Sequence, residues 1–408
     1  MRRKSPTLCS IFVVIVLLLT TSYAWSALAV ATDNTSIFRL DSVTGTSSNF
    51  TVDWGTTLPT QLAGVVTVAN QGLLYVVDKS AAGPLLHVLE INSNSATPTA
   101  RRVGNPIELW QGDTYVSQPS SLSMDANGGF YVLGNTNYAY VTSGYNVSVN
   151  MVASSSEYRP LADIATFSGG AVIVHENNHV GLPAGESWSS TVSGANTTSS
   201  HAISDQDNPN YTPRAVAVHP DNTTSSLAYI LSEYGESSAT VTVVDAATSV
   251  SPLGLASSIF DLPENMIPLD ITAFTTLTGK KCIGIVAKND IGAPPSQVLW
   301  RYELGSDGRV TGNRLTYNLL GTYSQNHRLQ VSADGEVLWI ANVEAGTVDI
   351  LDTDSWSLIN QLAVSSHINY TADWDGSFIT PPVPEPSSFI AFLTFATGMF
   401  GLARRRKR

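Results

Sequence analysis

Residues 331–342 read VSADGEVLWIAN, and residues 347–353 continue as TVDILDT. The first stretch has two apolar runs on either side of Asp334-Gly335, and the second stretch begins directly after Gly346. An Asp-Gly pair between apolar runs is a strong signal for a β-hairpin, because both residues tolerate a positive φ. These residues therefore predict three consecutive antiparallel strands joined by tight turns.

Weaker copies of this pattern recur upstream, at residues 67–77, 121–133, 165–174, 216–231 and 271–286. Aligning all copies on their second strand superposes six residues, which are Tyr75, Tyr131, Val172, Tyr229, Gly284 and Trp339. The steps between them are 56, 41, 57, 55 and 55 residues. A period near 50 residues, with three or four strands in each repeat, is typical of β-propeller blades. A pair of β-sandwiches is the alternative, but it would not need this period.

The two ends of the body supply a seventh blade. Residues 368–379, INYTADWDGSFI, repeat the first two strands of the pattern, and residues 36–42, SIFRLDS, are similar to the third strand at 349–353. Residues 50–54, FTVDW, follow as a fourth strand. We therefore predict an all-β, seven-bladed propeller over residues 32–380, in which residues 37–40 pair beside the strand near Tyr370. Sharing one blade between the termini removes the open sheet edge of a linear array.

The N-terminus has the order of a secretory signal peptide. Three cations in residues 1–4 precede an apolar run at 11–19 and then small residues. The apolar run is short for a permanent membrane helix. Residues 27–29 and 29–31 both read small–x–small, which predicts a signal peptide over 1–31 and a mature start near Val30 or Thr32. Export by the Sec machinery follows from this prediction, and an uncleaved anchor helix is the alternative.

The C-terminus has three parts in a fixed order. Residues 381–388 form a Pro-rich linker, and residues 389–403 form an apolar stretch that predicts a transmembrane helix. Prolines keep the linker extended and unpaired, which leaves its backbone open to a processing enzyme. Fifteen helical residues reach about 22 Å, short of a hydrocarbon core of roughly 30 Å. The chain ends in a basic cytoplasmic tail, Arg404, Arg405, Arg406, Lys407 and Arg408.

This arrangement, with Val383, Pro384, Glu385 and Pro386 before the apolar stretch, resembles the PEP-CTERM sorting signal. Exosortase-type membrane proteases recognise that signal in bacteria that make extracellular polysaccharide. The resemblance implies transient anchoring in the inner membrane, removal of the tail by an exosortase, and delivery to the cell surface or extracellular matrix. An ordinary tail anchor, which would stay on the mature protein, is the alternative.

The body carries a second resemblance. Residues 331–353 resemble YVTN-type and lactonase-like propeller repeats, and the propeller fold hosts binding, scaffolding and catalysis alike. We expect a binding or scaffold propeller associated with exopolysaccharide or biofilm, with a polysaccharide or surface protein as ligand. The alternative is a secreted lactonase- or lyase-like enzyme, which would need acids and histidines from several inner strands to meet at the mouth of the central channel.

Charge narrows the list of partners. Removing the signal peptide and the tail after Pro386 takes away eight cations and no acids, so the formal charge changes from −12 to −20. A body this acidic repels nucleic acid and anionic membrane surfaces. Nucleic acid is therefore excluded as a partner.

Several motifs suggest metals, but each has a simpler explanation. Residues 175–179, HENNH, match the H-E-x-x-H pattern of zinc proteases, which requires a helix. The flanking glycines and the proline at 183 predict a strand leading into a loop instead, so no zinc site is expected. Acidic positions in 205–210 and the pairs Asp352/Asp354 and Asp373/Asp375 leave structural calcium open, although turn chemistry explains them equally well. No catalytic residue and no cofactor is predicted.

Cysteine adds little to the function. Cys9 leaves with the signal peptide, so Cys282 has no intrachain partner. It lies in the apolar run CIGIV, which predicts a buried structural thiol rather than a nucleophile.

Overall fold

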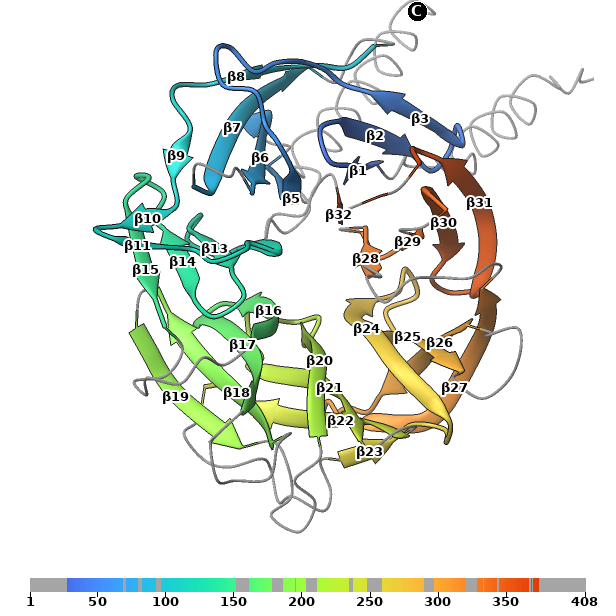
Figure 1. Cartoon of the computed structure of the whole chain (residues 1–408). Coiled ribbons are helices and arrows are strands. Elements are labelled where there is room, and N and C mark those ends of the chain that lie inside the picture. Colours follow the sequence, from blue (N-terminus) through green and yellow to red (C-terminus); the bar gives the residue numbers. More distant parts are fainter. Residues whose placement is uncertain are drawn as a thin grey trace, which may run out of the picture.

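A computed structural model describes residues 28–68, 71–79, 83–92, 97–151, 161–177, 186–194, 196–202, 211–234, 238–247, 259–289, 297–319, 329–332, 334–342, 345–366, 368 and 370–373. Seven sheets, each built on four antiparallel strands, surround a central axis like the blades of a fan (Figure 1). The all-β, seven-bladed propeller is confirmed. Over this part of the chain no helix is long and apolar enough to cross a membrane. The sorting motif, the apolar stretch at 389–403 and the basic tail lie outside the described residues.

Each blade has four strands, numbered here from the axis outward. Blade 1 is β5 (Leu62–Val68), β6 (Leu73–Asp78), β7 (Leu85–Asn92) and β8 (Thr99–Arg102). Blade 2 is β12 (Ser121–Met124), β13 (Phe130–Leu133), β14 (Tyr138–Val141) and β15 (Val147–Asn150). Blade 3 is β16 (Leu161–Phe167), β17 (Gly170–Asn177), β18 (Glu186–Ser193) and β19 (Asn196–Ala202).

The chain continues around the ring in the same way. Blade 4 is β20 (Tyr211–Val218), β21 (Leu227–Tyr234), β22 (Ser238–Asp245) and β23 (Ile259–Asp261). Blade 5 is β24 (Met266–Thr275), β25 (Lys281–Asn289), β26 (Gln297–Leu304) and β27 (Val310–Leu319). Blade 6 is β28 (Leu329–Val331), β29 (Val337–Asn342), β30 (Thr347–Asp352) and β31 (Ser357–Ala363).

The repeat read from the sequence corresponds to the second strand of six blades. The six aligned residues lie on β6, β13, β17, β21, β25 and β29. The turn between β28 and β29 contains Gly335 at φ 74°, and the Gly335 N–H donates to the carbonyl of Ser332 at 2.8 Å. The positive φ and the closing hydrogen bond confirm the predicted Asp-Gly turn.

Blade 7 closes the ring with strands from both ends of the chain. Its order from the axis is β32 (Tyr370–Asp373), β1 (Leu28–Thr32), β2 (Ile37–Asp41) and β3 (Thr46–Asn49). The shared blade is confirmed, but the predicted neighbour of Tyr370 was wrong. Tyr370 lies opposite Thr32 of β1, and residues 37–40 lie one strand further out.

Strand β1, LAVAT, was missed because its first four residues, 28–31, were assigned to the end of the signal peptide. A short apolar run with small residues suits a cleavage region and a buried strand equally well. Ala29, Val30 and Ala31 are fully buried in the folded protein. Four of the five residues of the first strand therefore lie inside the segment predicted as residues 1–31.

The predicted fourth strand of blade 7, residues 50–54, was also wrong. β4 (Thr51–Asp53) runs parallel to β8 and extends the sheet of blade 1. Phe50 and Trp54 on either side of it are buried with Leu62 and Leu74 of blade 1. Their burial holds the segment against the neighbouring blade, because large apolar side chains contribute most by leaving water.

The hydrophobic core lies between the blades rather than at the axis. One cluster joins Tyr229 and Leu231 of blade 4 to Ile283 and Trp300 of blade 5. The other clusters likewise mix residues of adjacent blades. Each blade is therefore stabilised mainly by its two neighbours, as in other repeat proteins.

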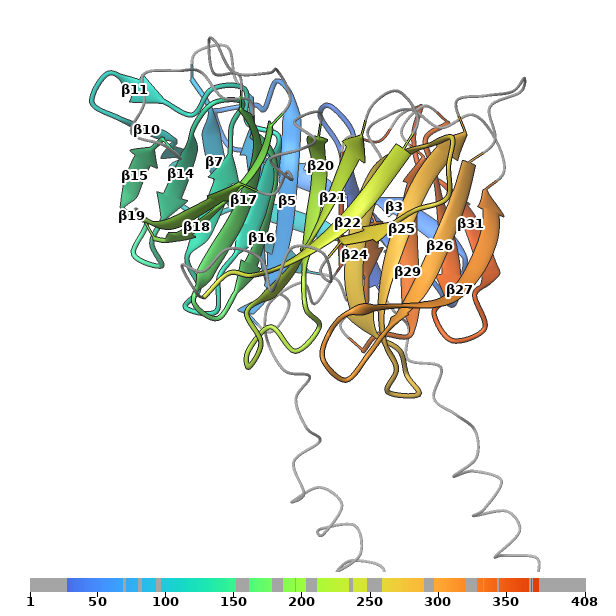
Figure 2. The ribbon, with the colours of Figure 1, turned by 90° about the horizontal axis from the view of Figure 1, so that it is seen from below.

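The strands run between two faces of the disc (Figure 2). Ala29 near the start of β1 lies opposite Asp373 at the end of β32, so both ends of the described body lie at one face, here called the terminal face. The turn from β1 to β2 lies at the opposite face. The entry into β5 lies there too, because the Leu62 N–H donates to the carbonyl of Asn34 in that turn at 2.8 Å.

Candidate functional site

The H-E-x-x-H motif begins on a strand. His175, Glu176 and Asn177 are the last residues of β17, so the strand prediction is confirmed over these three. His175 is fully buried, and its Nε2 lies 3.0 Å from the Oγ of Ser190 on the next strand. His179 lies outside the described residues. A strand does not place residues i and i+4 on the shared helical face that zinc proteases use.

Two acids of the inner strands, Asp163 and Asp270, join neighbouring blades. The Oδ2 atom of Asp163 on β16 accepts the N–H of Val216 on β20 at 3.0 Å. The Oδ2 atom of Asp270 on β24 accepts the N–H of Leu329 on β28 at 2.7 Å. Both carboxylates are buried, where hydrogen bonds offset the cost of their desolvation. These two acids therefore serve the fold.

Of the calcium candidates, Asp352 makes a contact within its own turn, and Asp354 makes a contact to the neighbouring blade. Asp352 Oδ1 accepts the N–H of Ser355 at 2.6 Å, and Asp354 Oδ1 accepts the hydroxyl of Thr278 at 2.5 Å. Among the described residues no three His, Cys, Asp or Glu side chains gather as a metal site. Residues 205–210 and Asp375 lie outside them.

Cys282 is a buried structural residue, as predicted. It lies on β25 with no exposed surface, and burial raises the pKa of its thiol to about 11. A thiol in this environment stays protonated and is a poor nucleophile.

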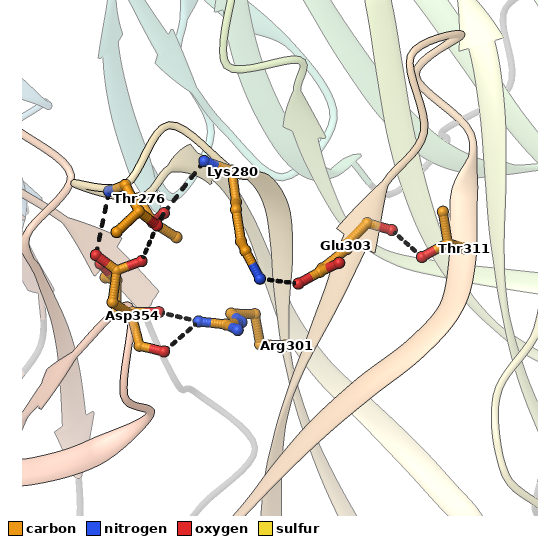
Figure 3. A network of polar contacts seen from close by, with 8 residues as sticks. Thr276, Lys280, Arg301, Glu303, Thr311 and Asp354 are labelled. Atoms are coloured by element: carbon orange, nitrogen blue, oxygen red, sulfur yellow. Dashed lines mark hydrogen bonds and ion pairs between the residues drawn. The ribbon is translucent and has the colours of Figure 1, made fainter.

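A network of charged groups joins blades 5 and 6 (Figure 3). The buried Arg301 donates from Nη1 to the carbonyls of Thr353 and, at 2.8 Å, Asp354. Lys280 pairs with Glu303 at 2.7 Å. Burial works to raise the pKa of Asp354, but hydrogen bonds from Thr278 and nearby groups outweigh it and leave the pKa lowered. These charged groups are partnered within the protein, so the network is structural.

Trp356 completes the same joint. Its ring stacks on Phe274 with centroids 6.3 Å apart and lies 5.7 Å from the Arg301 guanidinium. Its backbone has φ 57°, and the matching turn of blade 7 has Gly45 at φ 62°. In both turns the residue at positive φ donates its N–H to the carbonyl four residues earlier, at about 3 Å. Trp356 therefore adopts a conformation that suits glycine, and its ring packs between the blades.

A cleft of about 760 Å³ lies at the joint between blades 1 and 2, on the face opposite the chain ends. Three short strands outside the blade repeat contribute to this region. They are β9 (Ile107–Glu108), β10 (Trp110–Gln111) and β11 (Thr114–Tyr115). The β10–β11 hairpin projects at the upper left in Figure 2. Sequence reasoning missed this cleft, although an 18-residue interval between β8 and β12 marks an insertion.

The aromatic wall of the cleft is held in place. Trp110 lies against Gly83, where a Cβ atom would approach the indole ring to 2.9 Å, so only glycine fits there without displacing the ring. Leu109 and Val116, on either side of the hairpin, are fully buried. Asn137 donates to the carbonyl of Tyr115 at 2.8 Å. The Tyr115 side chain is nevertheless 58% exposed, so an aromatic ring faces solvent on a rigid support.

Part of the polar wall, Gln61 and Lys79, comes from blade 1, and Asp113 and Gln118 of the insertion between β8 and β12 complete it. Lys79 directly follows β6 and donates its N–H to the carbonyl of Gln61 at 2.8 Å. Asp78 accepts the N–H groups of Thr60 and Gln61, at 3.0 and 2.9 Å, and so holds the wall in place. The Lys79 side chain is half-buried, and this burial lowers the pKa of its amine. No carboxylate of the described residues lies within ion-pair distance of it.

Comparison with solved structures agrees with the propeller class. The chain resembles a putative 6-phosphogluconolactonase from Bacteroides uniformis, with a TM-score of 0.53, 11% identity, and coverage of 85% of this chain and 99% of that one. It also resembles a periplasmic gluconolactonase from Pseudomonas aeruginosa, with a TM-score of 0.54, 12% identity, and coverage of 85% and 98%. At such identities the likeness shows the fold alone.

Residues 382–408 match the PEP-CTERM protein-sorting motif. The chain therefore carries this motif behind a seven-bladed propeller with lactonase-like structural neighbours. The motif implies an exported protein that is anchored transiently in the membrane and processed by an exosortase. No curated protein matches the chain.

Proposed function

We propose that the mature protein is a non-catalytic binding or scaffold propeller at the cell surface or in the extracellular matrix, associated with exopolysaccharide. The observation that carries the proposal is the sorting motif at 382–408 behind a propeller body. The buried inner-strand acids Asp163 and Asp270 are engaged by backbone N–H groups of the next blade, which supports binding over catalysis. The lactonase-like alternative has support from the fold alone.

The position of the chain ends supports this proposal. Leu28 and Asp373 lie at the terminal face, and the sorting segment follows Asp373 in the chain. The cleft of blades 1 and 2 lies at the opposite face. A protein held by its C-terminal segment would therefore present the cleft away from the membrane.

The position of β1 refines the expected mature start. A mature start at Val30 or Thr32 would remove two or four of the five residues of a buried strand that pairs with both β2 and β32. Residues 24–26, Ala-Trp-Ser, also read small–x–small. We therefore expect Sec-dependent export followed by cleavage just before Ala27.

Intact-mass measurement on protein from the native bacterium tests the proposal. The mature protein should begin near Ala27 and lack the segment after Pro386, and it should be found outside the cytoplasm. In a strain without exosortase the tail should remain and the protein should stay in the membrane. Extracellular protein that still carries residues 404–408 would overturn the sorting step, and a start at Thr32 would overturn the role of β1.

A further inference from the structure

We propose that the cleft between blades 1 and 2 is a binding site for an uncharged polysaccharide chain. This inference rests on the proposed function, which it deepens by naming the site and the class of ligand. It is carried by a fixed aromatic wall, a polar wall of mixed hydrogen-bonding character, and the charge of the body.

The aromatic wall matches the apolar faces of sugar rings. Pyranose rings present C–H groups on one face, and these pack on flat aromatic surfaces that are rigid before binding. Trp110 is fixed against Gly83, and Tyr115 is exposed on a hairpin whose base is buried. A rigid, exposed aromatic ring loses little entropy on binding, which is why Trp and Tyr are common at binding hot spots.

The polar wall matches hydroxyl groups. Lys79 offers donors, Asp113 offers acceptors, and the side chains of Gln61 and Gln118 offer both. A sugar hydroxyl both donates and accepts, so it uses such a mixed set fully. Gln118 has φ 45°, an uncommon conformation for a residue other than glycine, and this kind of strain is found at ligand sites.

Charge favours an uncharged polymer over an acidic one. Lys79 is the one cation among the described residues that line the cleft, and Asp113 on the facing hairpin carries the opposite charge. The mature body has a formal charge of −20, which repels polyanions at long range. A chain of neutral sugars is repelled neither by Asp113 nor by the negative charge of the body.

The dimensions suit a segment of polymer. The cavity of about 760 Å³ lies within the range of roughly 300–1,000 Å³ common for ligand sites. Gly112, Asp113 and Tyr115 on one rim are exposed. Because the rim is open, a long chain can enter sideways rather than only by its end.

The test uses the mature protein purified from culture and its affinity for two groups of soluble polymers. The uncharged group is dextran, β-glucan, galactomannan, xylan and the neutral fraction of the native matrix. The acidic group is alginate and polygalacturonate. We expect at least one uncharged polymer to bind, and we expect Trp110→Ala to weaken this binding about tenfold or more and Tyr115→Ala by about threefold.

Tyr145→Ala is the matched control. Tyr145 is similarly exposed, at 44%, but it follows β14 at the terminal face, so this variant should bind within about twofold of the wild type. Lys79→Met is a second variant of the cleft, and it keeps the test valid if Trp110→Ala does not fold. It should also weaken binding. The proposal would be overturned if no uncharged polymer bound, or if only the acidic polymers bound. It would also be overturned if Trp110→Ala and Lys79→Met bound the uncharged polymer as well as the wild type does. None of these outcomes affects tail removal, which tests the sorting step separately.

Discussion

Two joints between neighbouring blades place charged and aromatic side chains close together, with opposite results. At the joint of blades 5 and 6, Arg301 is buried and donates to two carbonyls of the next blade, while Trp356 stacks over it. At the joint of blades 1 and 2, Lys79 and Asp113 face a cleft, and among the described residues neither has an ion-pair partner. The polar groups of the first joint hydrogen-bond to the neighbouring blade. Those of the second joint line a cleft instead.

The difference separates residues that stabilise the fold from residues available to a ligand. A buried charge with several hydrogen bonds has its desolvation cost offset, so its removal destabilises the protein. A half-buried amine without a partner costs stability, and a protein keeps such a group where function needs it. The comparison therefore predicts large stability effects at one joint and small ones at the other.

The largest effect is expected at Trp356. Trp356→Ala should lower the free energy of unfolding by about 3 kcal/mol, since a large buried ring is lost. Trp356→Gly should be less harmful than Trp356→Ala by about 1 kcal/mol, because glycine accepts φ 57° without strain. Urea denaturation of the three proteins measures both values. A glycine variant less stable than the alanine variant would show that the positive φ is not strained.

A somewhat smaller loss is expected for Arg301→Met, which keeps the length of the side chain but removes two hydrogen bonds to the next blade. The unfolding free energy should fall by about 2 kcal/mol, because two buried carbonyls lose a charged donor. The control is Arg309→Met, whose side chain is 43% exposed beside Asp307 and should change stability by less than about 0.5 kcal/mol. Equal effects of the two variants would contradict the structural role of the network.

Acid should weaken the joint of blades 5 and 6 through Asp354. Its pKa is lowered below the ordinary 3.8, so its stabilising contribution is present above that value and is lost as the pH falls through the lower, folded-state pKa. The difference in Tm between the wild type and Asp354→Asn should therefore be present at pH 7 and shrink below about pH 3.8. Thermal scans across this range measure it, and a difference independent of pH would rule out a role for the charge.

The smallest effect on stability is expected at the cleft. Lys79→Met removes a half-buried amine without an ion-pair partner among the described residues, so stability should be unchanged or rise by up to about 1 kcal/mol. The same denaturation experiment applies. A loss of more than 1 kcal/mol would show that Lys79 supports the fold, and the contrast between the two joints would fail.

Local patterns predicted much of the fold. The Asp-Gly turn at 334–335 and the recurrence of residues such as Tyr229 and Trp339 placed second strands in six blades. The same patterns assigned residues 28–31 to the signal peptide, because an apolar run of small residues has no local feature that separates the two roles. Residues 50–54 look like a strand and contain one, but its partner belongs to the neighbouring blade.

The candidate site could be predicted only in part. The sorting motif is contiguous, so Val383 to Pro386 were readable from the sequence, and they lie within the motif match at 382–408. The cleft is not contiguous, since Lys79 and Trp110 are separated by the whole of β7, β8 and β9. Neither residue has a local motif that would have pointed to the other.

The amino-acid sequence by itself determined the strand repeat, the number of blades, the acidic charge and the sorting segment, because each depends on residues that are neighbours in the chain or on a simple sum. Tertiary structure decided which strand lies beside Tyr370, which backbone groups Asp163 and Asp270 bind, and that Trp110 and Lys79 line one cleft. Those arrangements depend on closure of the ring. Closure brings residues more than 300 positions apart into one blade, and no local preference specifies such a pairing.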